Sequence, residues 1–299
     1  MWQKPYRQRG NWCSRIGLGA IIGIVLILLA ASNRCVDLSY HNQVLAAANS
    51  LNSPNSPNSP NSPSYSQEAK MQAELERLAR EDPLGLLKLA LKNYQNAVRD
   101  YICTFIKQER IDGHLNEEEK IRVCFKEAPF SVMMSWCEPK GLVDKVLYVD
   151  KDNNSIMLVR PTGLAGMLVH TVRRDVHDPK VKKITLRTPA QFGFGRSLQD
   201  IIAVCEQAQQ NGDLVSDYLG IKKVDGRDCL VLVRKLPMDK GYPAAKLVVY
   251  LDKDYLLPTR VESYDAAGNR FSLYMYLDVR FNLGLTDELF SPQANGMDG

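Results

Sequence analysis

The sequence lacks the residue patterns on which many enzyme active sites are built. It has four histidines, one of them at position 41 in a low-complexity stretch, and no Gly-x-Ser-x-Gly motif. Acid–base and nucleophilic catalysis both need positioned groups of this kind. The sequence therefore predicts a protein that is not an enzyme, with no catalytic residue and no cofactor.

The sequence also gives little support for a metal site. His170, Asp175, His177 and Asp178 lie close together, and such side chains can bind a metal ion. Five lysines and arginines lie among them within residues 173–183, and these would repel a cation. We expect no metal site here, but a charged surface loop. A second interpretation is that the loop contacts an acidic partner or lipid headgroups.

Beyond the N-terminal segment there is no excess of one charge. The chain has 38 basic and 34 acidic residues, and its first 32 residues hold four basic and no acidic ones. The remainder therefore carries 34 of each sign. A nucleic-acid-binding domain has a basic excess, so we predict no nucleic-acid partner.

Closely spaced cysteine pairs are absent. Seven cysteines occur, none of them in a Cys-x-x-Cys pattern. We favour buried, unpaired thiols that act as small hydrophobic side chains, although an oxidising compartment would also permit disulfides. The five cysteines of the globular part are Cys103, Cys124, Cys137, Cys205 and Cys229.

The sequence has one long hydrophobic run, at residues 16–31, and four basic residues precede it. This order is typical of an export signal. The run has 16 residues, somewhat fewer than the roughly 20 of a spanning helix. Residues 1–35 are therefore either a cleaved signal peptide or a retained anchor that holds the protein in the inner membrane through residues 16–31. In both cases we expect an exported protein of the periplasm or cell envelope.

A linker follows at residues 36–66. Asn-Ser-Pro is repeated four times between Asn52 and Pro63. Proline at every third position disfavours both helix and sheet, so this stretch is predicted to be a disordered, extended tether. The folded domain is then expected at residues 67–299.

Helical patterns occur at two places in this domain. Residues 67–98 are predicted to form two helices, the second capped by Asp82 and started by Pro83. A second helical region is expected from Ser197 to about Asn211. The rest is predicted to form short strands separated by turns, such as Asp112-Gly113. This order predicts an α+β fold with a largely antiparallel sheet.

The last strand, residues 270–281, has the clearest alternation. We expect one side of it to face an apolar interior and the other to face water. The predicted interior residues are Phe271, Leu273, Met275, Leu277, Val279 and Phe281.

Several short motifs resemble a known family. They are Lys107-Gln108-Glu109-Arg110, Leu257-Pro258-Thr259-Arg260, Asp265-Ala266-Ala267-Gly268, Tyr274-Met275-Tyr276-Leu277-Asp278-Val279 and Phe290-Ser291-Pro292. They resemble lipoprotein-carrier-like domains, the LolA, LolB and RseB class, and in particular an uncharacterised family on that fold, domain of unknown function 1571. The resemblance covers about residues 83–292. These motifs are structural turns and edges rather than an active-site signature.

The resemblance implies an incomplete antiparallel β-barrel of about ten to eleven strands, with helices packed across its concave face. In the carriers, the space between sheet and helices accepts acyl chains. In the stress-sensing members, a similar domain contacts a membrane-bound partner. We therefore expect a non-enzymatic envelope protein that binds lipid, an acyl chain or a lipoprotein in its concave face. The alternative is a sensor or interaction domain that contacts a membrane protein and has no permanent ligand.

Candidate cavity residues follow from the predicted inward faces of the strands. The same residues would instead form a dry core if the helices pack directly on them. Phe192 and Phe194 are candidate lid residues at the cavity mouth. The candidate lining residues are Phe105, Val123, Phe125, Val132, Met134, Trp136, Leu247, Val249, Leu251, Leu273, Met275 and Leu277.

Overall fold

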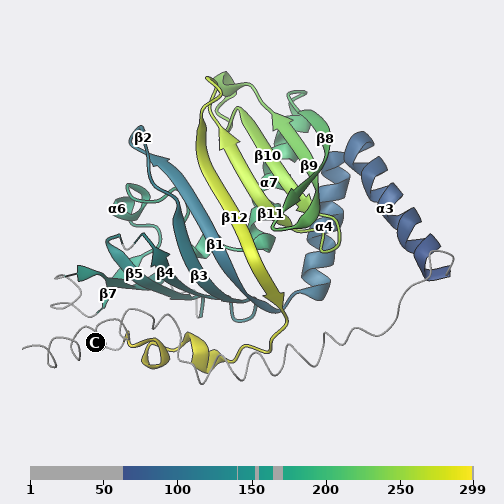
Figure 1. The fold of residues 1–299 in the computed structure, drawn as a ribbon. Coiled ribbons are helices and arrows are strands. Elements are labelled where there is room, and N and C mark those ends of the chain that lie inside the picture. The colour runs from purple at the N-terminus through teal and green to yellow at the C-terminus, as the bar shows by residue number, and fades with distance from the viewer. Residues whose placement is uncertain (1–62, 140, 152–154, 164–170, 298–299) are drawn as a thin grey trace, which may run out of the picture. The chain divides into compact units, whose positions relative to one another are not determined.

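The computed structural model describes residues 63–139, 141–151, 155–163 and 171–297 (Figure 1). The predicted signal or anchor at residues 1–35 and the linker as far as residue 62 lie outside these residues. Among the described residues no helix is both long enough and apolar enough to cross a membrane.

A single antiparallel sheet of twelve strands dominates the described residues (Figure 1). Its order is β7-β6-β5-β4-β3-β1-β12-β11-β10-β9-β8, with β2 paired to β1. The strands are β1 (Asp100–Ile111), β2 (His114–Leu115), β3 (Glu119–Lys126), β4 (Ser131–Glu138), β5 (Val143–Val149), β6 (Ile156–Pro161), β7 (Val172–Asp175), β8 (Val215–Val224), β9 (Arg227–Lys235), β10 (Lys246–Asp252), β11 (Pro258–Tyr264) and β12 (Arg270–Phe281).

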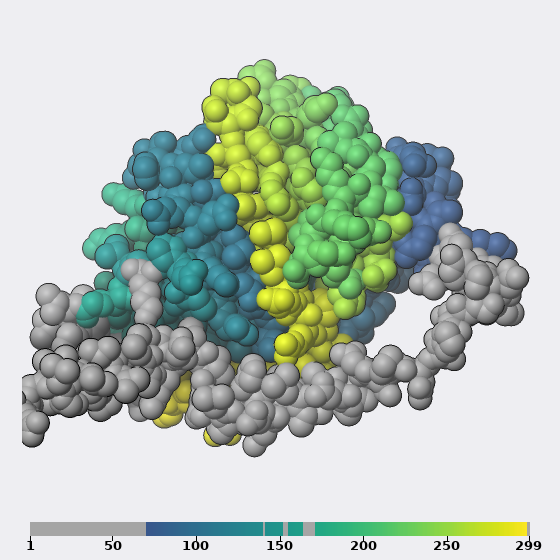
Figure 2. Space-filling view, viewed as in Figure 1, coloured from purple at the N-terminus to yellow at the C-terminus, as the bar shows by residue number. Residues whose placement is uncertain are grey.

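The sheet is open, because β7 and β8 form its two edges in the described part of the chain. The antiparallel, incomplete character that we predicted is confirmed, and the strand number is twelve rather than ten to eleven. In the space-filling view, β12 forms a yellow band between the blue-teal strands of the first half and the green strands of the second (Figure 2). The first and last strands of the domain therefore meet at the centre of the sheet, where β1 pairs with β12.

One of the three longer helices begins at the residue predicted from the sequence, and the other two begin three or four residues earlier. The longer ones are α3 (Pro63–Glu81), α4 (Pro83–Ala97) and α7 (Phe194–Gln210). Asp82 caps α4 and accepts the N–H of Gly85 at 2.8 Å, as predicted. Helix α3 begins four residues before residue 67, because proline is favoured in a first turn. Helix α7 begins at Phe194, before the predicted Ser197.

The shorter elements are connectors. Between β7 and α7 lie α6 (Pro179–Lys182) and the 3₁₀ turn η1 (Pro189–Gln191). The others are η2 (Met238–Lys240), η3 (Asp287–Phe290) and η4 (Gln293–Asn295). We call residues 181–192 the crossing segment, because they run from the last residues of α6 over the sheet to α7.

The two faces of the sheet are covered differently. We call the face that bears α3, α4 and α7 the inner face, and the opposite face the outer face (Figure 1). On the inner face, the helices and strands β9–β11 enclose one buried cluster, which includes Leu86, Leu198, Leu230 and Leu251. A second inner cluster, rich in aromatic rings, lies over β1, β3, β4 and β12.

The C-terminal residues return to the outer face. Leu285, Phe290 and Met297 pack there against Met133 and Leu147 of β4 and β5. Asp100, which is 5% exposed, fixes the start of this tail. Its carboxylate accepts the N–H groups of residues 283, 284 and 285 at 2.6, 3.1 and 3.2 Å. The tail is therefore part of the folded domain.

The face assignment of β12 corrects our prediction for its first half. Tyr276 lies opposite Phe105, and Tyr274 lies opposite Lys107 and Val261, all on the inner face. Residues 271, 273, 275 and 277 therefore point to the outer face. The alternation alone assigns the two tyrosines, with their polar hydroxyls, to the solvent side. Tyrosine, however, is readily buried when its hydroxyl finds a partner.

A β-bulge explains why the end of β12 nevertheless follows the prediction. The β1–β12 register shifts between Ile102 and Thr104, and Asp278 has a φ of 51°. An extra residue in one strand reverses the side-chain alternation beyond it. Val279 and Phe281 therefore return to the inner face, where they pack against the aromatic cluster.

Candidate ligand-binding site

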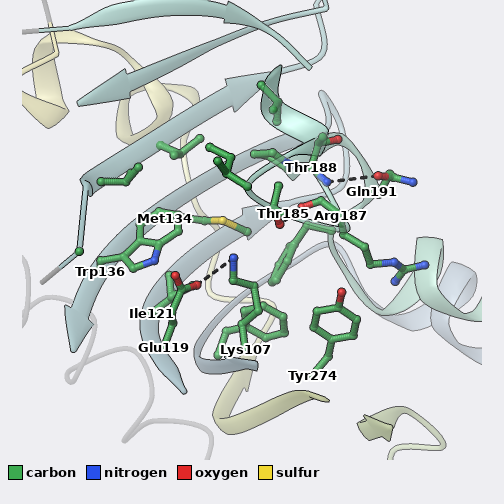
Figure 3. Close-up of a pocket in the computed structure, with 18 of the residues that line it drawn as sticks. Lys107, Glu119, Ile121, Met134, Trp136, Thr185, Arg187, Thr188, Gln191 and Tyr274 are labelled. Atoms are coloured by element: carbon green, nitrogen blue, oxygen red, sulfur yellow. Dashed lines mark hydrogen bonds and ion pairs between the residues drawn. The ribbon is translucent and has the colours of Figure 1, made fainter. Parts of the chain in front are cut away.

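A cavity of about 580 Å³ lies on the inner face between β1, β3–β6, β11–β12 and the crossing segment. Its wall is mostly apolar. Figure 3 shows Met134 and Trp136 on one side and Thr185 and Thr188 of the crossing segment on another. The apolar wall comprises Phe105, Ile111, Ile121, Met134, Trp136, Leu142, Val143, Val146, Met157, Val159, Val181, Ile184, Pro189, Phe192 and Val261.

Polar groups gather where the crossing segment meets β1 and β12. Lys107 Nζ lies 2.8 Å from a carboxylate oxygen of Glu119 (Figure 3). Arg187 forms an ion pair with Asp200, and its guanidinium lies 5.7 Å from the ring centre of Tyr274. The cavity therefore has an apolar wall and one polar region, as small-molecule sites commonly have.

A buried carboxylate holds the crossing segment to the sheet. Glu109 is 2% exposed and does not itself line the cavity. One of its oxygens accepts the hydroxyl of Tyr274 at 2.6 Å. The other accepts the hydroxyl of Thr185 at 2.9 Å and the N–H of Leu186 at 3.1 Å. Lys107 Nζ lies 3.6 Å from the same oxygen and supplies a compensating charge. These bonds position the cavity wall.

Aromatic rings form the floor where the crossing segment ends. Phe192 packs against Phe105 and Tyr276, with ring centres 5.1 and 5.6 Å apart. The following residue, Gly193, has a φ of 106°, and a Cβ there would lie 3.1 Å from the ring of Phe125. Only glycine fits this backbone conformation and this close approach without strain. The chain can therefore turn from the cavity wall directly into α7.

Burial of these tyrosines changes their acidity. Desolvation, followed by the nearby carboxylate of Glu109, raises the pKa of Tyr274 far above its ordinary value. Burial, with a contribution from Cys103, likewise raises the pKa of Tyr276. Both hydroxyls are therefore protonated at neutral pH, and Tyr274 is a stable hydrogen-bond donor to Glu109.

The structure brings four of the predicted site residues to the cavity wall: Phe105, Met134, Trp136 and Phe192. Val123, Phe125 and Val132 lie beside it in the buried aromatic cluster. Phe194, predicted as a lid residue, is fully buried at the start of α7, where its ring centre lies 4.2 Å from that of Tyr276. It is part of the core, because α7 begins earlier than predicted.

The remaining predicted residues lie elsewhere. Leu247, Val249 and Leu251 face inward, but α4 and α7 cover them, and they form the dry core that was the alternative interpretation. Leu273, Met275 and Leu277 are on the outer face because of the reversal described above.

Other cavity residues were missed at the sequence level. Ile121 alternates with Val123, and Met157 and Val159 alternate on β6, so period two could have found them. The crossing segment carries no periodic signal, because its residues reach the cavity from an irregular connection. Glu109 shows no local signal either, since its partners lie 76 and 165 residues away in sequence.

Reactive groups, namely metal-binding clusters and cysteine thiols, would determine which chemistry the domain supports. Among the residues that the structure describes, no group of histidine, cysteine, aspartate and glutamate could hold a metal ion. Burial raises the pKa of the thiols of Cys103 and Cys205, and raises that of Cys124 to about 11. Cys103, Cys124, Cys205 and Cys229 form no disulfide. With its mostly apolar wall, the arrangement is suited to enclosing an apolar group.

Comparison with known proteins finds several solved structures that are similar to this chain and one family model that matches it. No curated protein matches the chain. A putative outer membrane lipoprotein-sorting protein domain from Vibrio parahaemolyticus is 17% identical with a TM-score of 0.34, over 70% of this chain and 97% of that one. The Mycobacterium tuberculosis lipoprotein LppX is 13% identical with a TM-score of 0.37, over 66% and 94%.

A third similar structure is the Pseudomonas aeruginosa MucA/MucB complex, at 12% identity and a TM-score of 0.42, over 69% of this chain and 60% of the matched one. All three TM-scores are below 0.5. The family model described as "Protein of unknown function (DUF1571)" matches residues 98–296. This range spans the sheet from β1 to the C-terminal tail, and the chain belongs to the DUF1571 family.

Proposed function

We propose that this protein binds the apolar chain of a lipid, a fatty acid or a lipoprotein in the cavity of its inner face. The observation that carries the proposal is the cavity itself, of about 580 Å³ and lined mainly by aliphatic and aromatic side chains. Cavities of roughly 300–1,000 Å³ with such walls bury small ligands. Met134 and Met157 add flexible, polarisable side chains that adapt to a chain of variable shape.

Burial of methylene groups would supply the affinity. Each CH₂ moved from water into such a cavity contributes about 0.8 kcal/mol, so part of an acyl chain is enough for useful binding. The polar region would then hold the polar end of the ligand. Lys107 lies between Glu109 and Glu119 there, and Arg187 is paired with Asp200. Lys183, which also borders the cavity, is therefore the group that would contact an anionic end of the ligand.

We propose that the protein acts in the cell envelope and that it binds its ligand without catalysing a reaction. The basic residues before the apolar run at 16–31 support export of the domain to the cell envelope. Lipids and lipoproteins are present there. The cavity would bind and release its ligand without chemical change, since its wall is mainly apolar.

Native mass spectrometry of the full chain, purified from an expressing periplasm or membrane and followed by lipid extraction, tests the proposal. We expect a bound species of lipid mass. Val159→Trp should fill the cavity and remove that species, because Val159 lines it. Leu158→Trp is the matched control: it is the preceding residue of β6, is also half-buried and packs on the outer face.

A protein that stays free of ligand after incubation with membrane lipids would contradict the proposal. Loss of the bound species in both tryptophan variants would also contradict it, since the effect would then come from damage to β6 and not from a filled cavity.

A further inference from the structure

Large apolar side chains are exposed around the mouth of the cavity. Leu142, in the β4–β5 connection, is 85% exposed, and Ile184 and Leu186 of the crossing segment are 61% and 43% exposed. Leu142 and Ile184 also line the cavity, so the exposed group is continuous with its apolar wall. Exposed apolar residues that gather at one place mark an interaction site more often than scattered ones do.

Lysines lie beside this apolar rim. In α6, Val181 is buried and lines the cavity, whereas Lys180 and Lys182 on either side of it are exposed, as is Lys183. The nearby carboxylates are engaged locally. Asp175 accepts the hydroxyl of Ser155 and the N–H of His177, and Asp178 caps α6 through the N–H of Lys180. The lysine side chains can therefore reach an external anion.

An acidic run also borders the mouth, near Leu186. Residues 117–119 lead from the β2–β3 connection into β3, and Asn116 just before them donates its N–H to the carbonyl of Glu109, whose carboxylate accepts the N–H of Leu186. Glu119 is paired with Lys107, and Glu118 lies 3.9 Å from Arg270. The exposed positive charge at the mouth thus comes from Lys180, Lys182 and Lys183, which directly precede Ile184 in the chain.

We propose that the cavity mouth docks on the surface of an anionic lipid bilayer. Leu142, Ile184 and Leu186 enter the interface between headgroups and acyl chains, and Lys180 and Lys182 contact the headgroups. Apolar residues beside lysines are the combination with which peripheral proteins bind such surfaces. The inference rests on the proposed function, because docking at the mouth would let an apolar chain pass between bilayer and cavity without crossing water.

A protein partner fits this rim less well. Lysine is depleted in protein–protein interfaces, which favour arginine and large aromatic residues. The rim offers three aliphatic side chains and flexible lysines instead. Headgroups of a bilayer can be contacted by a flexible lysine from many positions, so charge complementarity favours the lipid surface.

Position-specific tryptophan fluorescence of the full chain on anionic vesicles that contain brominated lipid tests the docking. Leu186→Trp places the probe on the rim outside the cavity lining. Tyr255→Trp is the matched control, since Tyr255 is 44% exposed and contacts Phe281 at the far end of β12. Every variant keeps the apolar run at residues 16–31, so any attachment through that run is equal in both.

After subtraction of the parent spectrum, we expect quenching and a blue shift of the tryptophan introduced at position 186, and neither for the one at position 255. Added salt or neutral lipid should relieve the quenching, because the attraction is screened. Lys180→Gln with Lys182→Gln should weaken docking, by about fivefold per lysine. Equal quenching at both positions, or none at position 186, would overturn the proposal.

The same experiment separates docking from cavity binding. Trp136 lines the cavity, so a brominated chain inside it quenches this native tryptophan, and the difference between the parent and a Trp136→Phe protein isolates its signal. Quenching of Trp136 that persists in high salt, without quenching at position 186, would leave the cavity proposal intact and remove docking. Quenching at position 186 alone would keep docking and contradict the proposed function.

Discussion

The hydroxyl of Tyr274 donates a hydrogen bond of 2.6 Å to the carboxylate of Glu109, and this contact joins the central strands β1 and β12 to the crossing segment. The second carboxylate oxygen receives Thr185 and Leu186 from that segment. The crossing segment, which has little regular structure, thus obtains a fixed position over the cavity from one buried side chain. Hydrogen bonds to a charged acceptor are stronger than neutral ones. The shape of the cavity wall formed by the crossing segment therefore depends strongly on Glu109.

Replacement of Glu109 by Gln is expected to loosen the crossing segment. The amide cannot accept with both ends, so at least one of its three donors loses its partner and Lys107 loses part of its compensation. We expect a loss of about 1.5–3 kcal/mol in the free energy of unfolding. Hydrogen exchange should show faster exchange at the amide of Leu186.

Glu118→Gln is the control for this substitution. Its side chain is 54% exposed and lies 3.9 Å from Arg270, so the change should alter stability by less than about 1 kcal/mol. Slow exchange at Leu186 in the Glu109→Gln protein would show that other contacts hold the crossing segment.

Two methionines on different faces test the assignment of the cavity. Met134 lines the cavity and is 7% exposed, whereas Met275 lies on the outer face and is half-buried. Met134→Lys places a charge among apolar side chains and should abolish ligand binding, measured by retention of lipid in native mass spectrometry. Met275→Lys should preserve it. Loss of the ligand in the Met275→Lys protein, with the fold intact by circular dichroism, would contradict the face assignment.

Local signals predicted much of the fold. The Asp112-Gly113 turn between β1 and β2, with φ of 49° and 82°, follows from residues that tolerate positive φ. Asp82 and Pro83 placed the start of α4 correctly. The antiparallel sheet followed from strand runs separated by turns. Each of these features is determined by neighbours within a few residues.

The cavity depends on long-range relations that such signals do not contain. Alternation identified the two faces of β12, but only the pairing with β1 and β11 shows that Tyr274 and Tyr276 face inward. The bulge at Asp278 then reverses the pattern, and a single aspartate within a strand run does not by itself predict a bulge. Whether an inward side chain lines a cavity or a dry core depends on the helices above it. Val249 faces inward as predicted for a cavity residue, but it lies under α4 and α7.

The attachment of the C-terminal tail gives a further prediction. Asp100→Ala removes the acceptor of three backbone N–H groups at residues 283–285. Buried donors without partners are costly, so we expect about 3 kcal/mol less stability in urea denaturation. Limited proteolysis should also cut the tail within residues 283–297 sooner. Asp287→Ala, in the same tail but with a 73% exposed side chain, should change neither result much.

Stability should fall in alkaline solution because of the buried tyrosines. Burial raises the pKa of Tyr94, Tyr274 and Tyr276 in the folded protein above the ordinary value of about 10. Below pH 10 these phenols are neutral in both states, and their contribution to stability is complete. Above it they ionise when the chain unfolds but stay neutral when it is folded, so the free energy of unfolding falls with rising pH. Each tyrosine contributes at most about 1.4 kcal/mol per pH unit.

Urea denaturation between pH 7 and the alkaline range should therefore give a steeply falling stability above about pH 10. Tyr276→Phe removes one of these groups and should make the fall shallower, by up to about 1.4 kcal/mol per pH unit. Absorbance of tyrosinate in the folded protein checks the cause, since Tyr94, Tyr274 and Tyr276 should not titrate until the chain unfolds. An unchanged slope in the Tyr276→Phe protein would mean that this hydroxyl becomes exposed before global unfolding, and the aromatic floor of the cavity would then open locally.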